Sequence, residues 1–107
     1  MEVAGISFDS ARESALSFAY GNERSLELKR DPQNPYDPNV VEVLGHWRDE
    51  KGKEHSGFLG YVPRELAARI AKEAPSANLV ATLETLILPP EKEIPWDQFS
   101  IWASLSA

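Results

Sequence analysis

The chain has 107 residues, which is enough for one compact domain and too few for two. The absence of cysteine excludes a disulfide scaffold, a thiolate metal site and a cysteine nucleophile. The net charge of −6 argues against broad binding of nucleic-acid backbones, because such binding depends on a basic surface that releases counterions from the phosphates.

We expect neither a secretory signal peptide nor a membrane-spanning segment in this sequence. The N-terminal residues MEVAGISFDS do not combine a basic region with an apolar run, which is the pattern of a secretory signal peptide. The longest apolar run, near residues 79–88, is interrupted by Thr82, Glu84 and Thr85, so no segment is expected to span a bilayer. We therefore expect a single domain over residues 1–107, located in the cytoplasm and without a membrane partner.

Two segments have the apolar spacing of short helices. In residues 11–20, alanine and phenylalanine side chains recur on one face, and Ser10 and Glu13 have the spacing of a capping box. In residues 63–74, Pro63 suits the first helical position, and a stripe of leucine, alanine and isoleucine follows it. We therefore predict one helix near the start of the chain and a second helix after the central strands.

Six segments alternate or are rich in β-prone residues, as strands are. The predicted strands are 2–8, 25–30, 39–47, 55–62, 78–88 and 99–107, with a charged hairpin turn at 48–54. The alternation predicts that Val41 and Val43 share one face of their strand. In the strand over 78–88, it predicts one shared face for Leu79, Ala81, Leu83, Thr85 and Ile87. It also predicts a core position for Leu26, Leu28 and Trp102.

The predicted order of elements is strand, helix, three strands, helix and two strands. Short connections between consecutive strands favour antiparallel pairing, and glycines within strands favour bulges and strong curvature. We therefore predict a mainly β (α+β) domain. Its expected architecture is a small, strongly curved antiparallel β-barrel of about six strands, with two short helices that cover its openings.

The sequence contains no recognisable catalytic arrangement. It has no Gly-rich phosphate loop and no serine in a nucleophile-elbow pattern. His46 and His55 are nine residues apart without a carboxylate at ligand spacing, which disfavours a metal site. We therefore expect no cofactor, no metal and no enzymatic activity.

The most distinctive segment is DPQNPYDPN, residues 31–39, in which three prolines recur at every third position. Each proline follows an Asp or an Asn, a combination that is typical of turns. Because proline fixes φ, the segment is stiff, and Tyr36 and Asp37 are held near its centre. Such a segment is either a connector between two strands or a pre-organised binding loop.

Three blocks of the sequence occur in a familiar order: VAGISF, then LELKRDPQNPYDPNVVEV, then LGYVPRELAARIA. With them the chain resembles the HIRAN domain. That family's pattern includes a hydrophobic–Gly opening strand, an R-(D/E)-P-x-N-P-Y-D-x-N segment and a G-(Y/H)-x-x-(R/K)-E-L-A helix start. The resemblance covers nearly the whole chain and implies an OB-like barrel. It also implies capture of single-stranded DNA at a free 3′-hydroxyl end, to target a larger repair or remodelling motor or a nuclease.

The resemblance implies roles for three residues of the central loop. An ionised Asp37 can only accept hydrogen bonds, so it suits a 3′-hydroxyl donor and repels a 3′-phosphate. Alternatively, Asp37 only forms an Asx turn before Pro38. Tyr36 either stacks on a terminal base or packs over the barrel opening. Asn34 either donates to a phosphate oxygen or only shapes the turn.

The resemblance implies four further nucleic-acid-binding positions. Phe8 would stack on the last base, although a strand phenylalanine is more often part of the core. Tyr61 and Arg64 lie at the start of the second predicted helix, where backbone amides and the guanidinium group suit a phosphate. A solvated Arg64 is the alternative. Arg30 would either contact DNA or brace the proline segment against a nearby carboxylate.

The acidic charge keeps a second function open. A protein-interaction or regulatory module with the same fold and little DNA affinity would have a similar composition. The connection at residues 89–98 combines prolines with Trp96 and is the candidate for an exposed patch that binds a protein partner. The sequence thus predicts a binding module, with single-stranded DNA as its first partner and a protein as the alternative.

Overall fold

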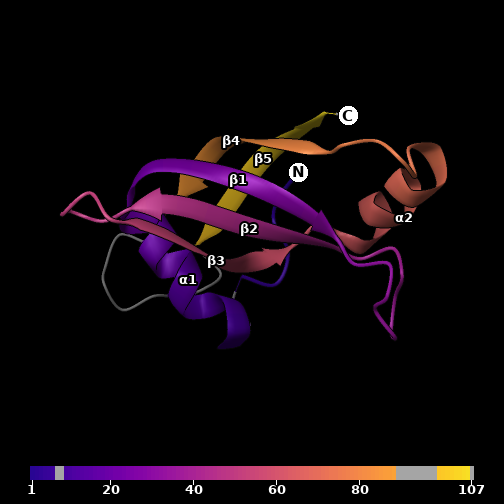
Figure 1. The fold of residues 1–107 in the computed structure, drawn as a ribbon, viewed down its shortest axis with the longest axis horizontal. Coiled ribbons are helices and arrows are strands. Elements are labelled where there is room, and N and C mark those ends of the chain that lie inside the picture. The colour runs from indigo at the N-terminus through magenta and orange to yellow at the C-terminus, as the bar shows by residue number, and fades with distance from the viewer. Residues whose placement is uncertain (7–8, 89–98, 107) are drawn as a thin grey trace.

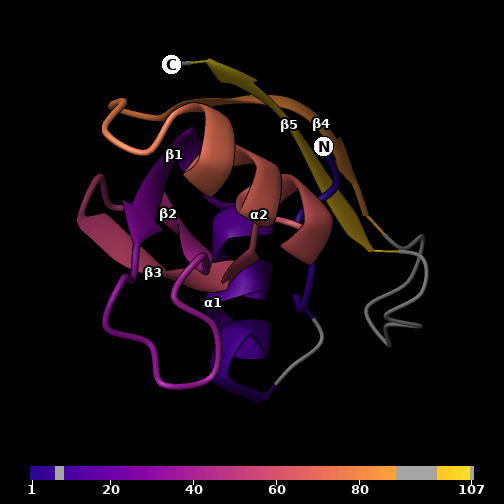
Figure 2. The same ribbon diagram turned by 90° about the vertical axis from the view of Figure 1, so that its right-hand side faces the viewer.

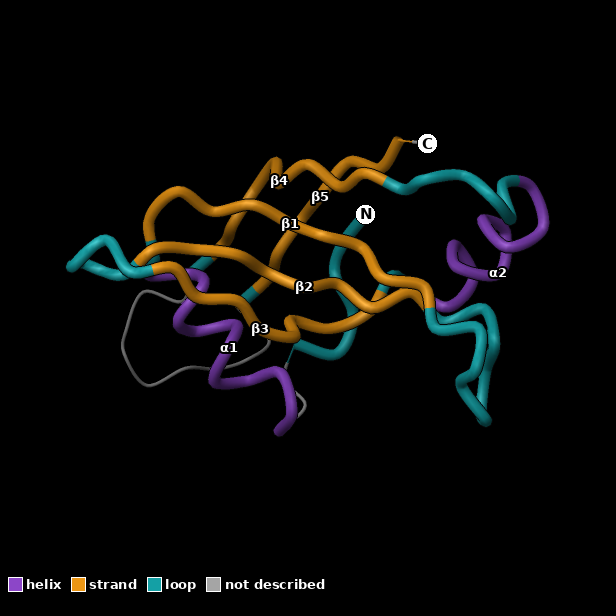
Figure 3. The backbone as a smooth tube through the Cα atoms, in the orientation of Figure 1, coloured by secondary structure: helices purple, strands orange, loops and turns teal. Residues whose placement is uncertain are grey.

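The computed structural model describes residues 1–6, 9–88 and 99–106. Within these residues, two helices and five strands make up the fold (Figures 1 and 3). In chain order they are α1 (Asp9–Tyr20), β1 (Asn22–Arg30), β2 (Val41–Arg48), β3 (Glu54–Tyr61), α2 (Arg64–Glu73), β4 (Val80–Ile87) and β5 (Ser100–Ser106). Both predicted helices and five predicted strands are confirmed. Neither of these helices is long and apolar enough to cross a membrane.

The strands form two antiparallel sheets. β1, β2 and β3 form one sheet in sequence order, and β4 pairs with β5 in the other. α1 packs against β3 and β2. α2 lies at the opposite end of the molecule, next to the loop that connects β1 to β2 (Figures 1 and 2). The fold is therefore mainly β with two helices, and the predicted antiparallel pairing is confirmed.

The N-terminal residues join the two sheets. An isolated bridge pairs Ala4 with Tyr61 of β3, and the amide of each residue donates to the carbonyl of the other at 2.8 Å. Val3 N donates to the carbonyl of Ile101 in β5, also at 2.8 Å. The predicted strand over residues 2–8 is therefore replaced by isolated bridges, with positions 7 and 8 outside the described residues.

β4 also lies against β1, so that one core is enclosed between the two sheets (Figures 1 and 2). The residues that join β5 to β3 close the opposite side. Among the described residues, no ladder of hydrogen bonds joins β1 to β4. The closed six-stranded barrel therefore stays a prediction, while the two-sheet arrangement is what the structure establishes.

The core draws on both sheets, α1 and the N-terminal residues. Its largest fully buried side chains are Phe18, Leu59, Ile101, Val3, Val41 and Val43. Leu26 and Leu28 of β1 are half-buried and pack against this cluster. The predicted inward faces of β1 and β2 are confirmed.

β4 changes face part-way along its length. The register with β5 shifts between Leu83 and Thr85, so Glu84 is an extra residue in β4. An extra residue reverses the alternation, and beyond it Leu86 packs against the core while Ile87 is 48% exposed. The predicted position of Thr85 and Ile87 on the same face as Leu83 is wrong for this reason.

Trp102 is a surface residue of β5, and its predicted core position is wrong. Its neighbours Ile101 and Ala103 are 0% and 1% exposed, whereas Trp102 is 40% exposed. Because alternate residues of a strand point to opposite faces, β5 can bury either the indole or the two aliphatic neighbours. The aliphatic residues are buried, and the indole Nε1 donates to Ser100 Oγ at 3.0 Å on the outside.

Gly60 permits the close approach of the N-terminal residues to β3. Its φ is +152°, and a Cβ at this position would overlap the carbonyl oxygen of Ala4. The register between β2 and β3 also shifts here, between Val43 and Leu44. Glycine alone fits both the backbone conformation and the contact. Gly60 therefore fixes where the N-terminal residues meet β3.

We expect Gly60→Ala to lower the free energy of unfolding by about 3 kcal/mol or more, because backbone strain adds to the clash with Ala4. Gly52→Ala is the matched control, since Gly52 has φ +80° but no neighbouring atom within 4 Å. Strain alone should cost this control about 1 kcal/mol. Urea unfolding measures both losses. Equal losses would contradict a specific contact between Ala4 and residue 60.

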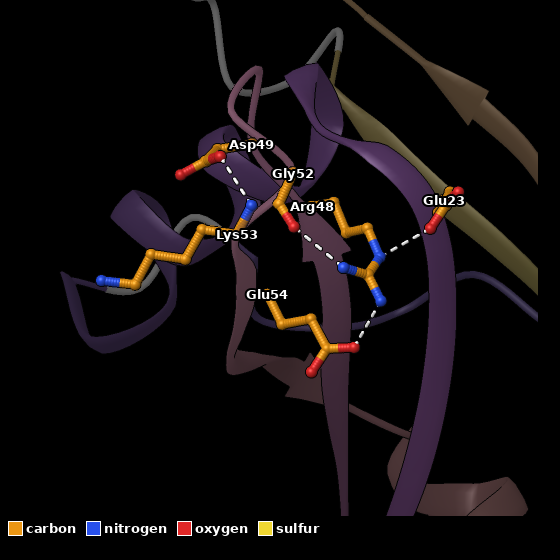
Figure 4. A network of polar contacts seen from close by, with 6 residues as sticks. All are labelled: Glu23, Arg48, Asp49, Gly52, Lys53 and Glu54. Carbon is orange, nitrogen blue, oxygen red and sulfur yellow. Dashed lines mark hydrogen bonds and ion pairs between the residues drawn. The ribbon is translucent and has the colours of Figure 1, made fainter.

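The β2–β3 hairpin is held by a network around Arg48 (Figure 4). The guanidinium group donates from Nη1 to the carbonyl of Gly52 at 2.8 Å and from Nη2 to Glu54 at 2.6 Å. Its Nε lies 2.7 Å from a carboxylate oxygen of Glu23 in β1. The network ties the start of β1 to the turn that the sequence predicts at 48–54, and it occupies each nitrogen of the arginine.

Asp49 gives this hairpin a dependence on pH. A hydrogen bond from His55 and the backbone amides of Lys53 and Lys51 hold the pKa of the Asp49 carboxyl below its usual 3.8. The folded state therefore gains stability from this carboxylate above about pH 4 and loses it as the pH falls through the lowered pKa.

We expect Asp49→Asn to be less stable than the wild type at about pH 6, with the gap closing by about pH 2. The asparagine keeps an oxygen for the two backbone amides but cannot titrate. Glu50→Gln, at an exposed position of the same turn, is the control and should show a smaller gap. Urea midpoints at both pH values measure the effect. A gap of the same size at both would contradict a stabilising charge on Asp49.

Candidate nucleic-acid interface

The loop of residues 31–40, here called the proline loop, lies beside α2 (Figure 2). A pocket of about 450 Å³ is lined by residues of this loop, of the start of α2 and of the N-terminal segment. Five of the seven predicted site residues line it: Asn34, Tyr36, Asp37, Tyr61 and Arg64. Valine and alanine side chains make up most of the remaining lining: Ala4, Val40, Val41, Val62 and Ala67. The fold thus gathers polar and aromatic groups around an apolar hollow, as ligand sites commonly do.

Asn34 organises the proline loop from within. Its Oδ1 accepts hydrogen bonds from the amides of Tyr36 at 2.9 Å and Asp37 at 3.1 Å. Its Nδ2 donates to a carboxylate oxygen of Asp31 at 3.2 Å. The loop is closed at its base by Asp31 N, which donates to the carbonyl of Val40 at 3.0 Å. The predicted turn-forming role of Asn34 is confirmed, and its contact with a phosphate stays a prediction.

Asp37 uses one carboxylate oxygen in the loop and turns the other toward α2. Its Oδ1 accepts from the amide of Asn39 at 2.9 Å, which confirms the predicted Asx turn. Its Oδ2 lies 3.8 Å from Arg64 Nε, beyond hydrogen-bond distance. The Asp37 side chain is 22% exposed. Asp37 thus lines the pocket with one carboxylate oxygen close to a cation.

Tyr36 projects from the proline loop with 95% of the residue exposed. The alternative in which its ring packs over a barrel opening is therefore wrong. The exposed ring of Tyr36 gains no stabilisation from burial in the folded monomer. The backbone amide of Tyr36 is nevertheless held by a hydrogen bond to Asn34. The loop fixes the backbone of Tyr36 and leaves its ring uncovered.

Tyr61 and Arg64 form the opposite wall of the pocket. Tyr61 ends β3 and is half-buried, while Arg64 opens α2 with its side chain 88% exposed. α2 begins after Pro63 without a side-chain cap, and its first turn is closed by a bond from Ala67 N to the Pro63 carbonyl at 2.9 Å. The amides of residues 64–66 therefore have no partner within the helix, which favours negative charge at this end.

The predicted site residue Arg30 does not join this group. Arg30 is absent from the pocket lining, and its Nη2 donates to the carbonyls of Ala74 at 2.6 Å and Ala77 at 3.1 Å. It braces the end of β1 against the segment that follows α2, through carbonyls in place of the predicted carboxylate. Phe8 lies outside the described residues. The part of the chain that the structure describes contains no cluster of histidine and acidic groups that could hold a metal.

Phe58 is a neighbour of the pocket that sequence reasoning missed. Its ring meets that of Tyr61 edge to face, with centroids 5.1 Å apart and planes at 68°. Residues three apart on a regular strand point to opposite faces, but Leu59 is an extra residue in the register with β2. The glycines of segment 55–62 indicate a bulge, but they do not give its position.

A model of the HIRAN domain matches residues 2–106, so the chain belongs to the HIRAN domain family. The resemblance in the three sequence blocks is thereby confirmed over nearly the whole chain.

Two curated relatives are similar to this chain. The helicase-like transcription factor of Homo sapiens is 32% identical over 95 residues, covering 77% of this chain and 9% of that protein. A Fanconi-associated nuclease 1 homolog of Oryza sativa subsp. japonica is 47% identical over 47 residues, covering 44% of this chain and 4% of that protein. The chain thus spans only a small part of each relative. No solved structure matches it.

We expect Asn34→Ala to loosen the proline loop, because the amides of Tyr36 and Asp37 lose their shared acceptor. The free energy of unfolding should fall by about 1–2 kcal/mol, and both amides should exchange hydrogen faster with solvent. Gln33→Ala, at an exposed position of the same loop, is the matched control. Unchanged exchange at the two amides in the Asn34 variant would contradict this role.

Proposed function

We propose that this domain binds single-stranded DNA at its free 3′-hydroxyl end, in the pocket beside the proline loop, and catalyses no reaction itself. Membership of the HIRAN family supports the proposal, as do the two relatives, whose names describe a helicase-like factor and a nuclease. The domain would then direct a larger motor or nuclease protein to DNA ends.

The observation that carries the proposal is Tyr36, an almost fully exposed ring on a rigid loop next to an acceptor carboxylate. Stacking of an aromatic side chain on a single-stranded base contributes about 1–3 kcal/mol and tolerates any base. A pre-set loop loses little entropy when it binds. The terminal base would stack on Tyr36 and leave its sugar near Asp37.

Asp37 would distinguish one end chemistry from another. A 3′-hydroxyl can donate to Asp37 Oδ2, and a hydrogen bond to an ionised acceptor is short and strong. A 3′-phosphate at the same place would meet a carboxylate and be repelled. Arg64, exposed and 3.8 Å from that carboxylate, can turn to the phosphate that links the last two nucleotides.

The proposed site predicts that affinity depends only weakly on salt. Each phosphate neutralised on a single strand adds about 0.7 to the slope of log affinity against log salt. Among the residues that line the pocket, Arg64 is the one cationic side chain. We therefore propose that binding rests on stacking and on the terminal hydroxyl, with few phosphate contacts.

The proposed fold of the binding domain is the six-stranded barrel expected from the sequence, with the OB-like character that the family resemblance implies. The bridges made by residues 1–4 and the position of β4 against β1 support it. OB folds bind oligonucleotides on one exposed sheet face and its loops.

A second candidate function is protein binding by the outer face of β4 and β5. Trp102, Val80 and Ile87 are exposed there, at 40%, 55% and 48%. An exposed apolar group on an acidic domain favours a protein partner over DNA. The predicted patch around Trp96 lies outside the described residues. Trp102→Ala separates the two functions, because it should leave DNA binding unchanged.

We expect the wild type to bind an oligonucleotide with a 3′-hydroxyl about tenfold or more tightly than one with a 3′-phosphate, measured by fluorescence anisotropy. Asp37→Asn keeps an oxygen for the Asx turn but loses the charge, so the preference should shrink to about twofold or less. Glu65→Gln removes the same charge from an exposed position of α2 and should keep it. Equal affinity of the wild type for both ends would sink the proposed function.

A further inference from the structure

The outer face of the β1–β2–β3 sheet carries apolar side chains that belong to no core cluster among the described residues. Leu44 of β2 lies opposite Phe58 of β3, and both are half-buried. Neither belongs to the core cluster or to the side chains packed against it. Val43 of β2 is fully buried, so Leu44 beside it points to the other side of the sheet.

The same argument places Phe58 on the outer face. A Cβ on Gly57 would touch Ser14 of α1, and Leu59 is fully buried, so both of these positions face inward. Phe58 between them points away from α1. Neither α1 nor α2 crosses this face of the sheet, which is open to the viewer in Figure 1 and to the left in Figure 2.

Phe58 is continuous with the pocket through Tyr61. Tyr61 lines the pocket and also meets the Phe58 ring at a centroid distance of 5.1 Å. The register shift at Leu59 brings these two rings to the same side of the sheet. Three aromatic rings therefore follow one another from the proline loop to the middle of the sheet: Tyr36, Tyr61 and Phe58.

We propose that Phe58, supported by Leu44, is a stacking position for the third nucleotide from the 3′ end of a single strand. The inference rests on the proposed function and extends it from the terminal nucleotide to the two nucleotides that precede it in the strand. The last base stacks on Tyr36, the second lies against Tyr61, and the third lies on Phe58. Aromatic platforms on an open sheet face are a common way to hold successive bases without reading their identity.

The charges around this path offer little attraction to a phosphate backbone. Lys29 and Glu42 lie opposite each other beside Tyr61, and Glu27 lies opposite Leu44. The face therefore offers no net positive charge to phosphates. Binding at Phe58 must come from stacking, which ionic strength screens little. The affinity gained from the third nucleotide should therefore persist in high salt.

The test compares oligothymidylates of two and four nucleotides, each with a 3′-hydroxyl, by fluorescence anisotropy at low and high salt. Wild type should bind the longer probe about tenfold more tightly at both salt concentrations. Phe58→Leu keeps an apolar side chain but removes the ring, and should bind the longer probe about tenfold less tightly than wild type. It should bind the shorter probe within twofold of wild type. Phe58→Tyr should restore the preference for length.

Trp102→Leu is the matched control, because it removes an exposed ring from the other sheet and should change neither affinity. If Phe58→Leu does not fold, NMR of the wild type provides the test. The ring resonances of Phe58 should then shift when the longer probe is added and should not shift with the shorter probe. Binding of both probes with equal affinity, or an unchanged Phe58 variant, would overturn this proposal and leave the proposed function standing. No binding of either probe by the wild type would overturn both.

Discussion

The structure depends on the way residues 1–4 hydrogen-bond to both sheets. Ala4 exchanges two backbone bonds with Tyr61, and Val3 donates to Ile101, so one short segment ties β3 to β5. Among the described residues, no other backbone hydrogen bond links the two sheets on this side, so without this segment the core between them would open. The same contact builds the candidate site, because Ala4 and Tyr61 are both part of its lining. The hydrogen bonds between Ala4 and Tyr61 thus support both the fold and the pocket. Gly60 permits them, because a side chain at this position would overlap Ala4.

The proline loop restrains the backbone of the exposed Tyr36. Prolines restrict φ along the loop, and Asn34 and Asp37 use side-chain oxygens to bond amides inside it. Arg30 holds the base of the loop to the segment beyond α2, and Arg64 stands at the other end of that helix. The backbones that carry Asp37 and Arg64 therefore belong to two anchored elements, while the side chains of Tyr36 and Arg64 are exposed.

The helices, most strands and the loop chemistry could be predicted because they follow local rules. Helical spacing, alternation and Asx–Pro turns act over a few residues. The failures at Ile87 and Trp102 come from a bulge and from a choice between two faces, and packing against distant strands decides both. Phe58 was missed for the same reason. Family resemblance brought Tyr61 and Arg64 together with the loop, whereas for Arg30 it could not distinguish a brace from a ligand contact.

The acidic charge argues against broad binding of DNA backbones, but it fits the proposed site for the 3′ end of a single strand. A basic groove would bind the interior of any strand, because backbone phosphates are the same along its length. A domain with net charge −6 repels such binding, and Asp37 within the pocket adds repulsion against a terminal phosphate. In the proposed site, the favourable contributions that remain are stacking on exposed rings and a hydrogen bond from the terminal 3′-hydroxyl, a donor that the interior of a strand lacks. For the proposed function, the negative charge is therefore part of the specificity, since it removes the affinity that the interior of a strand would otherwise have.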